Sequence, residues 1–132
     1  MIFVDSGVWI DFFRGVISPQ TDRFAAILKA GNACTGDLVV TEVLQGFTRQ
    51  RDVQTGWRLM SGVPIIVVGG RTVAYDAADN YRILRARGVT VRKTIDTLIA
   101  TRCIRDGLPL LHNDRDFDPF VEHLGLVDAL AH

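Results

Sequence analysis

Short, fully apolar segments alternate with longer amphipathic segments along most of the chain. The apolar segments predict buried strands, because strands covered on both faces of a parallel sheet carry continuous hydrophobic runs. The predicted strands are Ile2–Val4, Ala33–Thr35, Val63–Val68 and Leu108–Leu111, with Leu126–Val127 as a further edge strand.

The amphipathic segments predict helices bounded by residues that commonly start or end a helix. The predicted helices are Val8–Arg14, a segment from Ser18-Pro19 to Gly31, a segment from Gly36-Asp37 to about Phe47, Asp52–Met60, Thr72–Arg87, Thr94–Asp106 and Phe117–His123. Strands that alternate with helices predict an α/β fold with a central, mostly parallel sheet of four to five strands flanked by helices. We expect residues 1–132 to form a single domain.

The composition is that of a globular protein with a hydrophobic core and no need for disulfides. Of the 132 residues, 48% are hydrophobic and 23% are charged. There is no apolar run of membrane-spanning length and no basic leader segment, so we expect a cytoplasmic protein without membrane contact. Cys34 and Cys103 lie in apolar surroundings and are expected to be core thiols in a reducing compartment.

Charge is balanced over the whole chain and uneven along it. Fifteen basic and fifteen acidic residues give zero formal net charge, which argues against binding to nucleic acid through bulk charge alone. Residues 71–105 carry eight Arg or Lys against three Asp, whereas residues 112–132 carry five acids against one Arg. We therefore expect a basic and an acidic surface on one molecule.

Acidic residues follow two predicted strands and occupy two predicted helices. Asp5 follows the first strand, Asp114 follows strand 108–111, Asp96 lies in the first turn of helix 94–106, and Glu42 borders an apolar helix face. Each acid alone has a structural interpretation, as a helix cap, a partner of the helix dipole or a solvated residue. In a parallel sheet, however, strand carboxyl ends and helix N-termini share one edge, where ligands bind.

Carboxylates that converge there repel one another, and their pKa values rise unless a cation neutralises them. Oxygen ligands of this kind suit hard divalent cations such as Mg²⁺. A divalent ion stabilises charge on a phosphate and activates water for attack on phosphorus. A metal site is therefore the functional hypothesis, and a set of separate helix caps is the structural one.

Four stretches carry a family resemblance through their order and spacing: Val4-Asp5-Ser6, Thr41–Gly46, Asp96–Ala100 and Leu110–Phe117. Together they resemble the PIN-domain ribonucleases, specifically the VapC-type toxins of bacterial toxin–antitoxin systems, over nearly the whole chain. The resemblance implies a PIN-like three-layer fold. It also implies a metal-dependent endoribonuclease in which metal-activated water attacks an RNA phosphodiester bond.

Matched residue by residue, the resemblance implies an acidic quartet that holds Mg²⁺, with Mn²⁺ as a possible substitute. The quartet is Asp5, Glu42, Asp96 and Asp114, and Asp5 and Asp96 match the direct metal ligands. Asp116 matches an auxiliary acid of the last motif. Ser6 matches a hydroxyl that supports the site.

The same resemblance implies three partners, namely a VapB-type antitoxin, an RNA substrate and a second copy of the chain in a homodimer. The cluster Arg82, Arg85 and Arg87 is a candidate contact for the RNA backbone, and a solvated helix face is an equal alternative.

Two positions depart from the family pattern. Gly7 stands where members often carry a second small polar residue, so one contact of the site is expected to be missing. His112 stands where Thr or Ser is common, and we expect it to pack against the strand end rather than to bind phosphate.

Two other functions remain as alternatives. One is a PIN-type nuclease that processes RNA without acting as a toxin. The other is a receiver-like α/β signalling or binding domain without catalysis. A receiver needs two adjacent acids after its first strand and a Lys on a late strand, and this sequence has neither.

Overall fold

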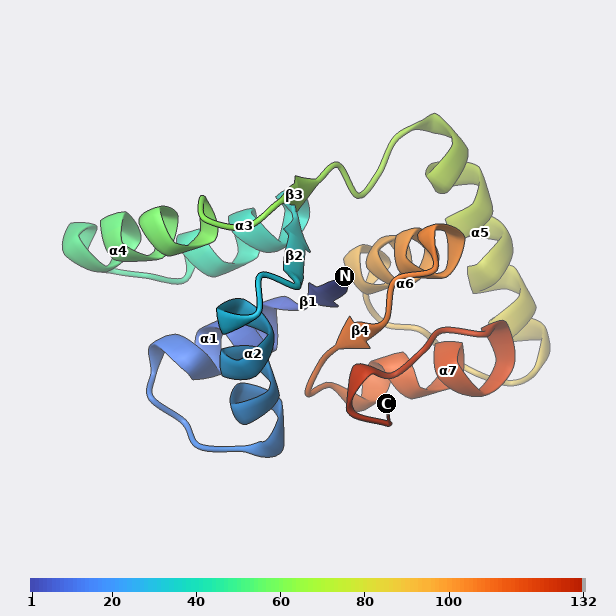
Figure 1. The fold of residues 1–132 in the computed structure, drawn as a ribbon. Helices are drawn as coiled ribbons and strands as arrows, with labels where there is room; N and C mark the ends of the chain where they lie inside the picture. The colour runs from blue at the N-terminus through green and yellow to red at the C-terminus, as the bar shows by residue number, and fades with distance from the viewer. Residues whose placement is uncertain (132) are drawn as a thin grey trace.

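A four-stranded parallel sheet lies at the centre of the fold (Figure 1). The computed structural model describes residues 1–131, and its strands lie in the order β3-β2-β1-β4. β1 (Ile2–Val4) lies between β2 (Ala33–Gly36) and β4 (Leu110–Leu111), and β3 (Ile65–Ile66) pairs with β2. All three pairings are parallel, so the strands present their carboxyl ends along one edge.

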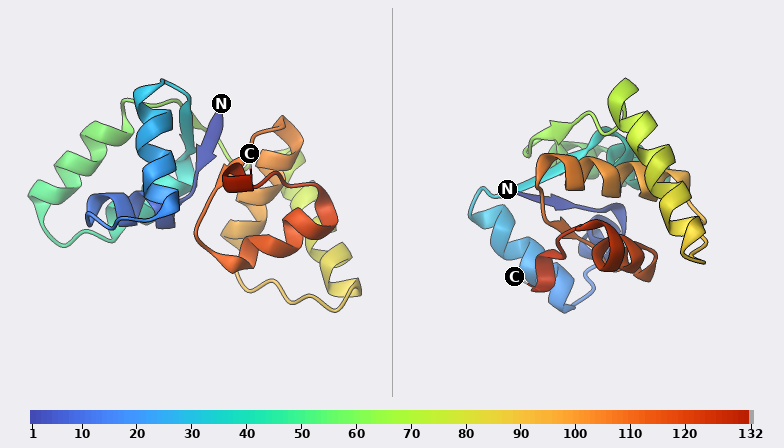
Figure 2. Two further views of the ribbon diagram at one scale, coloured as in Figure 1. Left: turned by 60° about the horizontal axis from the view of Figure 1, so that its bottom comes forward. Right: turned by 90° about the vertical axis from the view of Figure 1, so that its right-hand side faces the viewer.

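Helices cover the sheet on both sides, which confirms the predicted α/β architecture of three layers (Figure 2). One side carries α1 (Ser6–Phe13), α2 (Pro19–Lys29), α3 (Asp37–Gln45) and α4 (Gln50–Met60). The other carries α5 (Arg71–Ala86), α6 (Thr94–Asp106) and α7 (Asp118–Leu124), with 3₁₀ turns at Arg115–Phe117 and Ala129–Ala131. Within residues 1–131, no helix combines the length and apolar character that crossing a bilayer requires.

The helix boundaries follow the local signals in the sequence. Ser18 and Thr21 form a reciprocal capping box at the start of α2, with Pro19 in the first turn. The helix α6 ends at Gly107, whose φ of 67° lies in the left-handed region that favours glycine. These helices therefore begin and end close to the predicted positions.

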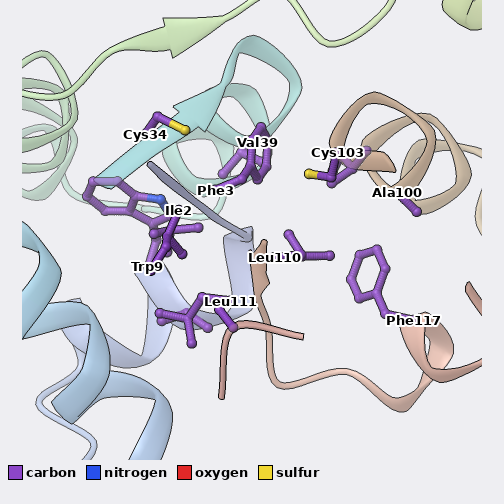
Figure 3. Close-up of a cluster of buried hydrophobic side chains, with 14 of the residues drawn as sticks. Ile2, Phe3, Trp9, Cys34, Val39, Ala100, Cys103, Leu110, Leu111 and Phe117 are labelled. Atoms are coloured by element: carbon purple, nitrogen blue, oxygen red, sulfur yellow. The ribbon is translucent and has the colours of Figure 1, made fainter. Parts of the chain in front are cut away.

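Side chains from both helical layers meet on the two faces of β1 and β4 to form the core (Figure 3). Phe3, Leu110 and Leu111 are fully buried on the central strands, and Trp9 joins them from α1. The Trp9 ring packs edge-on against Phe24, with ring centroids 4.6 Å apart, so this aromatic group belongs to the core. Both cysteines are buried and free, as expected.

One predicted strand is shorter and less buried than expected and another is absent, and in both places the chain meets the sheet at its edge. Val63–Val68 was expected to be a buried strand, yet only Ile65–Ile66 pair with β2, and Ile65 and Val67 are exposed. Two residues beyond Ile66, the Val68 N–H donates to the Asp37 carboxylate rather than to a backbone carbonyl of β2 (3.0 Å).

The expected edge strand at Leu126–Val127 is absent. After the left-handed turn at Gly125, the chain touches β4 through one isolated bridge between Leu110 and Asp128. The Leu110 N–H donates to the Val127 carbonyl (2.9 Å), and a 3₁₀ turn begins at Ala129 before a ladder forms. The sheet therefore has four strands in the described residues.

A buried hydroxyl ties the carboxyl ends of β1 and β2 together. Thr35 is fully buried and its Oγ1 donates to the Val4 carbonyl (2.9 Å). The same Oγ1 accepts a hydrogen bond from the indole Nε1 of Trp9 (3.3 Å). This network fixes the backbone directly before Asp5, at the edge where ligands bind in such sheets.

Replacing Thr35 with Val is predicted to lower the free energy of unfolding by about 1–3 kcal/mol, because the buried Val4 carbonyl and Trp9 indole each lose a partner. Urea denaturation of the two proteins measures the change. The control is Thr55→Val, which removes an exposed hydroxyl bonded within its own helix and is expected to change stability by less than about 0.5 kcal/mol. Equal losses for the two variants would contradict the prediction.

Candidate metal centre

The carboxylate of Asp5 is buried at the carboxyl end of β1 with only 5% of the residue exposed. Its backbone N–H donates to the Leu111 carbonyl (3.0 Å), so it lies beside the end of β4. The side chain makes no capping hydrogen bond to α1, and Oδ1 has no partner at all. The helix-cap interpretation of Asp5 is therefore wrong, and the buried oxygen calls for another partner.

Glu42 on α3 and Asp96 in the first turn of α6 each also have a buried carboxylate oxygen without a hydrogen bond. Asp96 is 6% exposed, and its Oδ2 makes no hydrogen bond. The Oε1 of Glu42 is also buried without a partner. Three carboxylate oxygens from three separate elements are thus buried and unsatisfied, an arrangement that costs free energy unless a ligand compensates it.

Burial is the main reason that the pKa of Asp5 rises to about 7. The neighbouring N–H of Ser6 opposes the rise, whereas the negative charges of Asp96, Glu42 and Asp114 add to it. Because charges act on one another appreciably only over short distances inside a protein, the four predicted acids lie in one region of the structure.

Burial likewise raises the pKa of Asp96 to about 6, with repulsion from Asp114, Glu42 and Asp116 adding to the shift and the Lys93 ammonium opposing it. The pKa of Glu42 also rises through burial, although the Ser6 side chain and Lys93 partly offset this. Ser6 therefore interacts with the acidic group, at the position where the family resemblance implies a supporting hydroxyl.

Asp114 differs from the other acids because its carboxylate has partners. Burial raises its pKa, but the hydrogen bond from the Asp116 N–H (2.9 Å) and the Lys93 ammonium outweigh burial and hold the pKa below its usual value. Asp114 thus caps the 3₁₀ turn that follows it, as one interpretation of the sequence expected, and remains ionised at neutral pH.

The most closely spaced carboxylates are those of Asp96, Asp114 and Asp116, which offer one oxygen each within 4.8 Å of one another. The family resemblance implied Asp5 and Asp96 as the direct ligand pair. In the structure Asp96 belongs both to this triplet and to the pair with Asp5, since its charge also acts on the Asp5 carboxylate. Asp116, expected as an auxiliary acid, is a full member of the triplet.

Lys93 lies among this triplet and was missed by the sequence reasoning. Its Nζ donates to Asp114 Oδ2 (3.1 Å) and lies 3.8 Å from Asp96 Oδ2 and 3.9 Å from Asp116 Oδ2. The hydrogen bond to Asp114 raises the pKa of Lys93, so the ammonium is charged at neutral pH. The Lys93-x-x-Asp96 spacing at a helix start was the available signal, because residues three apart face each other on a helix.

The two departures from the family pattern have different structural outcomes. His112 is buried with its ring 5.0 Å from that of Phe117, which confirms that it packs at the strand end. At Gly7, the side-chain amide of Asn113 fills the space that a Cβ would take. Asn113 Nδ2 donates to Asp11 Oδ2 (2.8 Å), so a side chain from the loop after β4 covers the start of α1 in place of a residue-7 side chain.

The predicted arginine cluster lies on α5 and the residue after it, and its contacts are away from the acids. Arg85 stacks over the Tyr81 ring at 5.6 Å, and Arg87 is hydrogen bonded to His123 Nδ1 (3.0 Å). Within residues 1–131, Lys93 is the cation that forms ion pairs with the triplet. Contact of Arg82, Arg85 and Arg87 with RNA stays a prediction.

A concave region of about 380 Å³ lies between α5 and α6 and has a different character. Four of its polar side chains are paired, because Asp76 pairs with Arg105 (2.8 Å) and Asn80 Nδ2 donates to Thr101 Oγ1 (3.0 Å). Unsatisfied buried carboxylates distinguish the Asp5 region from this one.

The donor set of the Asp5 region fits a hard divalent cation. The unsatisfied atoms of Asp5, Glu42 and Asp96 are all carboxylate oxygens, the ligand type that Mg²⁺ and Mn²⁺ prefer. An ion held by them would supply the missing partners and remove the repulsion that raises the pKa values of Asp5 and Asp96. The chemistry open to such a centre is metal-assisted hydrolysis.

Comparison with known proteins places this chain in a family. A family model described as "PIN domain" matches residues 2–121. The chain is 33% identical over 120 residues to VapC ribonuclease Mb1587 of Mycobacterium bovis and to ribonuclease VapC11 of Mycobacterium tuberculosis. Each alignment covers 89% of this chain and 90% of the relative.

Solved structures share the fold at lower identity. The structure of VapBC2 from Rickettsia felis bound to a promoter DNA fragment contains a chain with a TM-score of 0.75 and 16% identity, covering 96% of each chain. FitAcB from Neisseria gonorrhoeae gives a TM-score of 0.71 at 16% identity, covering 100% of this chain and 99% of the other. At these identities the likeness concerns the fold.

Without a divalent ion, the stability of the protein is predicted to fall as the pH rises from 5 to 8. The folded Asp5 carboxyl, with a pKa of about 7, retains a proton that the unfolded chain has released, so stability present at low pH is lost as pH rises through 7. One pKa unit corresponds to about 1.4 kcal/mol, so the free energy of unfolding of the wild type is expected to decrease by on the order of 2–3 kcal/mol between pH 5 and pH 8. This decrease is expected to be absent in Asp5→Asn.

Urea denaturation in chelator at pH 5 and pH 8 measures this loss for the wild type and for Asp5→Asn. Asp79→Asn is the control, because Asp79 is an exposed acid on α5. An identical pH dependence in the wild type and Asp5→Asn would contradict the assignment of the loss to Asp5.

Gly7 and Asn113 are predicted to be energetically coupled. Gly7→Ala gains helix propensity, but the new Cβ displaces the Asn113 amide and breaks its bond to Asp11. In an Asn113→Ala background no amide is displaced, so Gly7→Ala should be more favourable there by about 0.5–1.5 kcal/mol. Urea denaturation of the four proteins of this double-mutant cycle gives the coupling energy, and additive effects would rule the contact out.

Proposed function

Because the chain belongs to the PIN-domain family and is related to VapC ribonucleases over most of its length, we propose that it is a divalent-metal-dependent endoribonuclease. Its substrate is RNA, and the reaction is hydrolysis of phosphodiester bonds. The proposal includes the role of toxin in a toxin–antitoxin pair.

The observation that carries this proposal is the set of unsatisfied buried carboxylate oxygens on Asp5, Glu42 and Asp96. Structural helix caps would leave these oxygens hydrogen bonded, and solvated acids would leave them exposed. Because they are buried and have no hydrogen bond, these oxygens have the character of ligands prepared for a cation.

In the proposed site, Asp5 and Asp96 hold the ion directly, and Glu42 and Asp114 complete its surroundings. Mg²⁺ is the expected ion, with Mn²⁺ as a substitute, because the donor set consists of carboxylate oxygens. A bound divalent ion supplies positive charge that stabilises a phosphodiester undergoing attack and makes a water molecule more acidic.

The side chains of the protein then orient the reactants. Asp114 remains ionised at neutral pH, so its carboxylate can accept a hydrogen bond or proton from the attacking water. Asp116 supports the cluster beside Asp96 and Asp114, and the Ser6 hydroxyl supports it beside Glu42. Arg82, Arg85 and Arg87 are proposed to contact the RNA backbone, where a positive side chain offsets phosphate charge without reading the base sequence.

The proposed partners follow from the related structures. The neighbours in fold include VapBC2 from Rickettsia felis and a toxin–antitoxin complex from Klebsiella pneumoniae, which gives a TM-score of 0.70 at 18% identity over 96% of each chain. We therefore extend to this chain a VapB-type antitoxin partner, and we keep the homodimer as part of the proposal.

Asp5→Asn and Asp96→Asn are each predicted to reduce RNA cleavage by at least about 100-fold. Each substitution removes a negatively charged oxygen ligand of the divalent ion on which hydrolysis of RNA is proposed to depend. Purified protein is incubated with structured RNA in Mg²⁺ or in chelator, and cleavage is followed on denaturing gels. Cleavage in the wild type is expected with Mg²⁺ and not with chelator.

Asp79→Asn is the matched control, with the same chemical change on the exposed side of α5 and no expected loss of cleavage. Thermal melting with and without Mg²⁺ provides a second measurement, because an ion that binds the folded state alone raises the melting temperature. Cleavage that persists in chelator, or in both site variants, would overturn the proposal.

A further inference from the structure

The acidic region contains two groups of carboxylate oxygens with different partners. The buried oxygens of Asp5 Oδ1, Glu42 Oε1 and Asp96 Oδ2 have no hydrogen-bond partner. The oxygens of Asp114 and Asp116 face the ammonium of Lys93, at 3.1 and 3.9 Å. Asp96 Oδ2 borders both groups, since it lies 3.8 Å from the same ammonium.

We propose that Lys93 is a built-in cation that takes the place of a second divalent ion, so that the site binds one ion per chain. This inference rests on the proposed metal site. Asp96, Asp114 and Asp116 offer three oxygens within 4.8 Å of one another, which is a geometry able to hold a metal ion. In this chain the Lys93 Nζ contacts one oxygen of each of these three residues.

The position of Lys93 in the chain supports this role. Lys93 immediately precedes α6, and its carbonyl accepts a hydrogen bond from the Thr97 N–H (3.3 Å) in the first turn. Its backbone is therefore fixed by the same helix that carries Asp96. From there the side chain reaches Asp114 on the segment after β4, so one ammonium joins two elements that each supply an acid.

Occupancy of the triplet gives the physical reason for one ion. The Lys93 ammonium already lies against one oxygen each of Asp96, Asp114 and Asp116, in the place that a second divalent ion would need. A second divalent ion at the Asp96–Asp114–Asp116 triplet would have to displace an ammonium already within hydrogen-bonding distance of Asp114. Lys93 acts through the carboxylates and is a positioning residue in this proposal.

Lys93→Met tests the inference, because Met has similar length and no charge. Binding of Mn²⁺ at pH 7.5 is measured by isothermal titration calorimetry and by the loss of the free Mn²⁺ signal in electron paramagnetic resonance. The wild type is expected to bind one Mn²⁺ per chain and Lys93→Met to bind two. Lys93→Arg, which restores a cation, is expected to bind one.

Two further variants separate a specific role of Lys93 from a general effect of charge. Arg92→Met removes a neighbouring exposed cation that forms none of the ion pairs found within residues 1–131, and it is expected to bind one Mn²⁺. Lys93→Met combined with Asp116→Asn removes an acid of the triplet that is not among the proposed ligands of the first ion, and it is expected to return to one. Circular dichroism melting establishes that each variant is folded.

The outcomes distinguish this inference from the proposed function. One Mn²⁺ in both the wild type and Lys93→Met would overturn the role of Lys93 and leave the metal site intact. Two Mn²⁺ in the wild type would also overturn it, since Lys93 would not exclude the second ion. No Mn²⁺ bound by the wild type would overturn the metal site itself, together with the inference that rests on it.

Discussion

The burial of acidic side chains at the carboxyl edge of a parallel sheet is the constraint on which the site depends. Asp5 is 5% exposed and Asp96 is 6% exposed, and each leaves an oxygen without a hydrogen-bond partner. The core on either side of β1 excludes water from these groups, which raises their pKa values. Buried carboxylates without hydrogen bonds lower the stability of the fold, and this cost is the reason for the proposal that they bind a cation.

The protein relieves this repulsion unequally. On the more exposed side, Lys93 pairs with Asp114, which stays ionised. On the buried side, Asp5 and Asp96 retain raised pKa values in the absence of a cation. An ion that binds the buried oxygens would therefore stabilise the fold as well as prepare the site, since ligand binding to the folded state alone is coupled to folding. Stability and activity are expected to depend on the same few oxygens.

The acids themselves were predictable, whereas their roles within the group were not. Strand ends and helix starts along the chain identified Asp5, Asp96 and Asp114, because parallel strands share one carboxyl edge. Sequence alone left open whether the side chains of Asp5 and Asp114 cap helices, and the two proved different. The Asp114 side chain caps a 3₁₀ turn, whereas the Asp5 side chain makes no capping hydrogen bond to α1. Lys93 escaped notice because Asp114 and Asp116 lie 21 and 23 residues further along the chain and meet it only in the fold.

The sequence by itself determined the alternation of strands and helices, since buried strands need continuous apolar runs and helices need a 3.6-residue period with caps. It also indicated that Asp5, Asp96 and Asp114 lie at the carboxyl edge of the sheet. Tertiary structure decided the extent of each strand, as at β3, where only Ile65 and Ile66 pair with β2 and the Val68 N–H donates to the Asp37 carboxylate. It also decided which carboxylates are desolvated and which are paired, because burial and charge contacts arise between elements far apart in the chain.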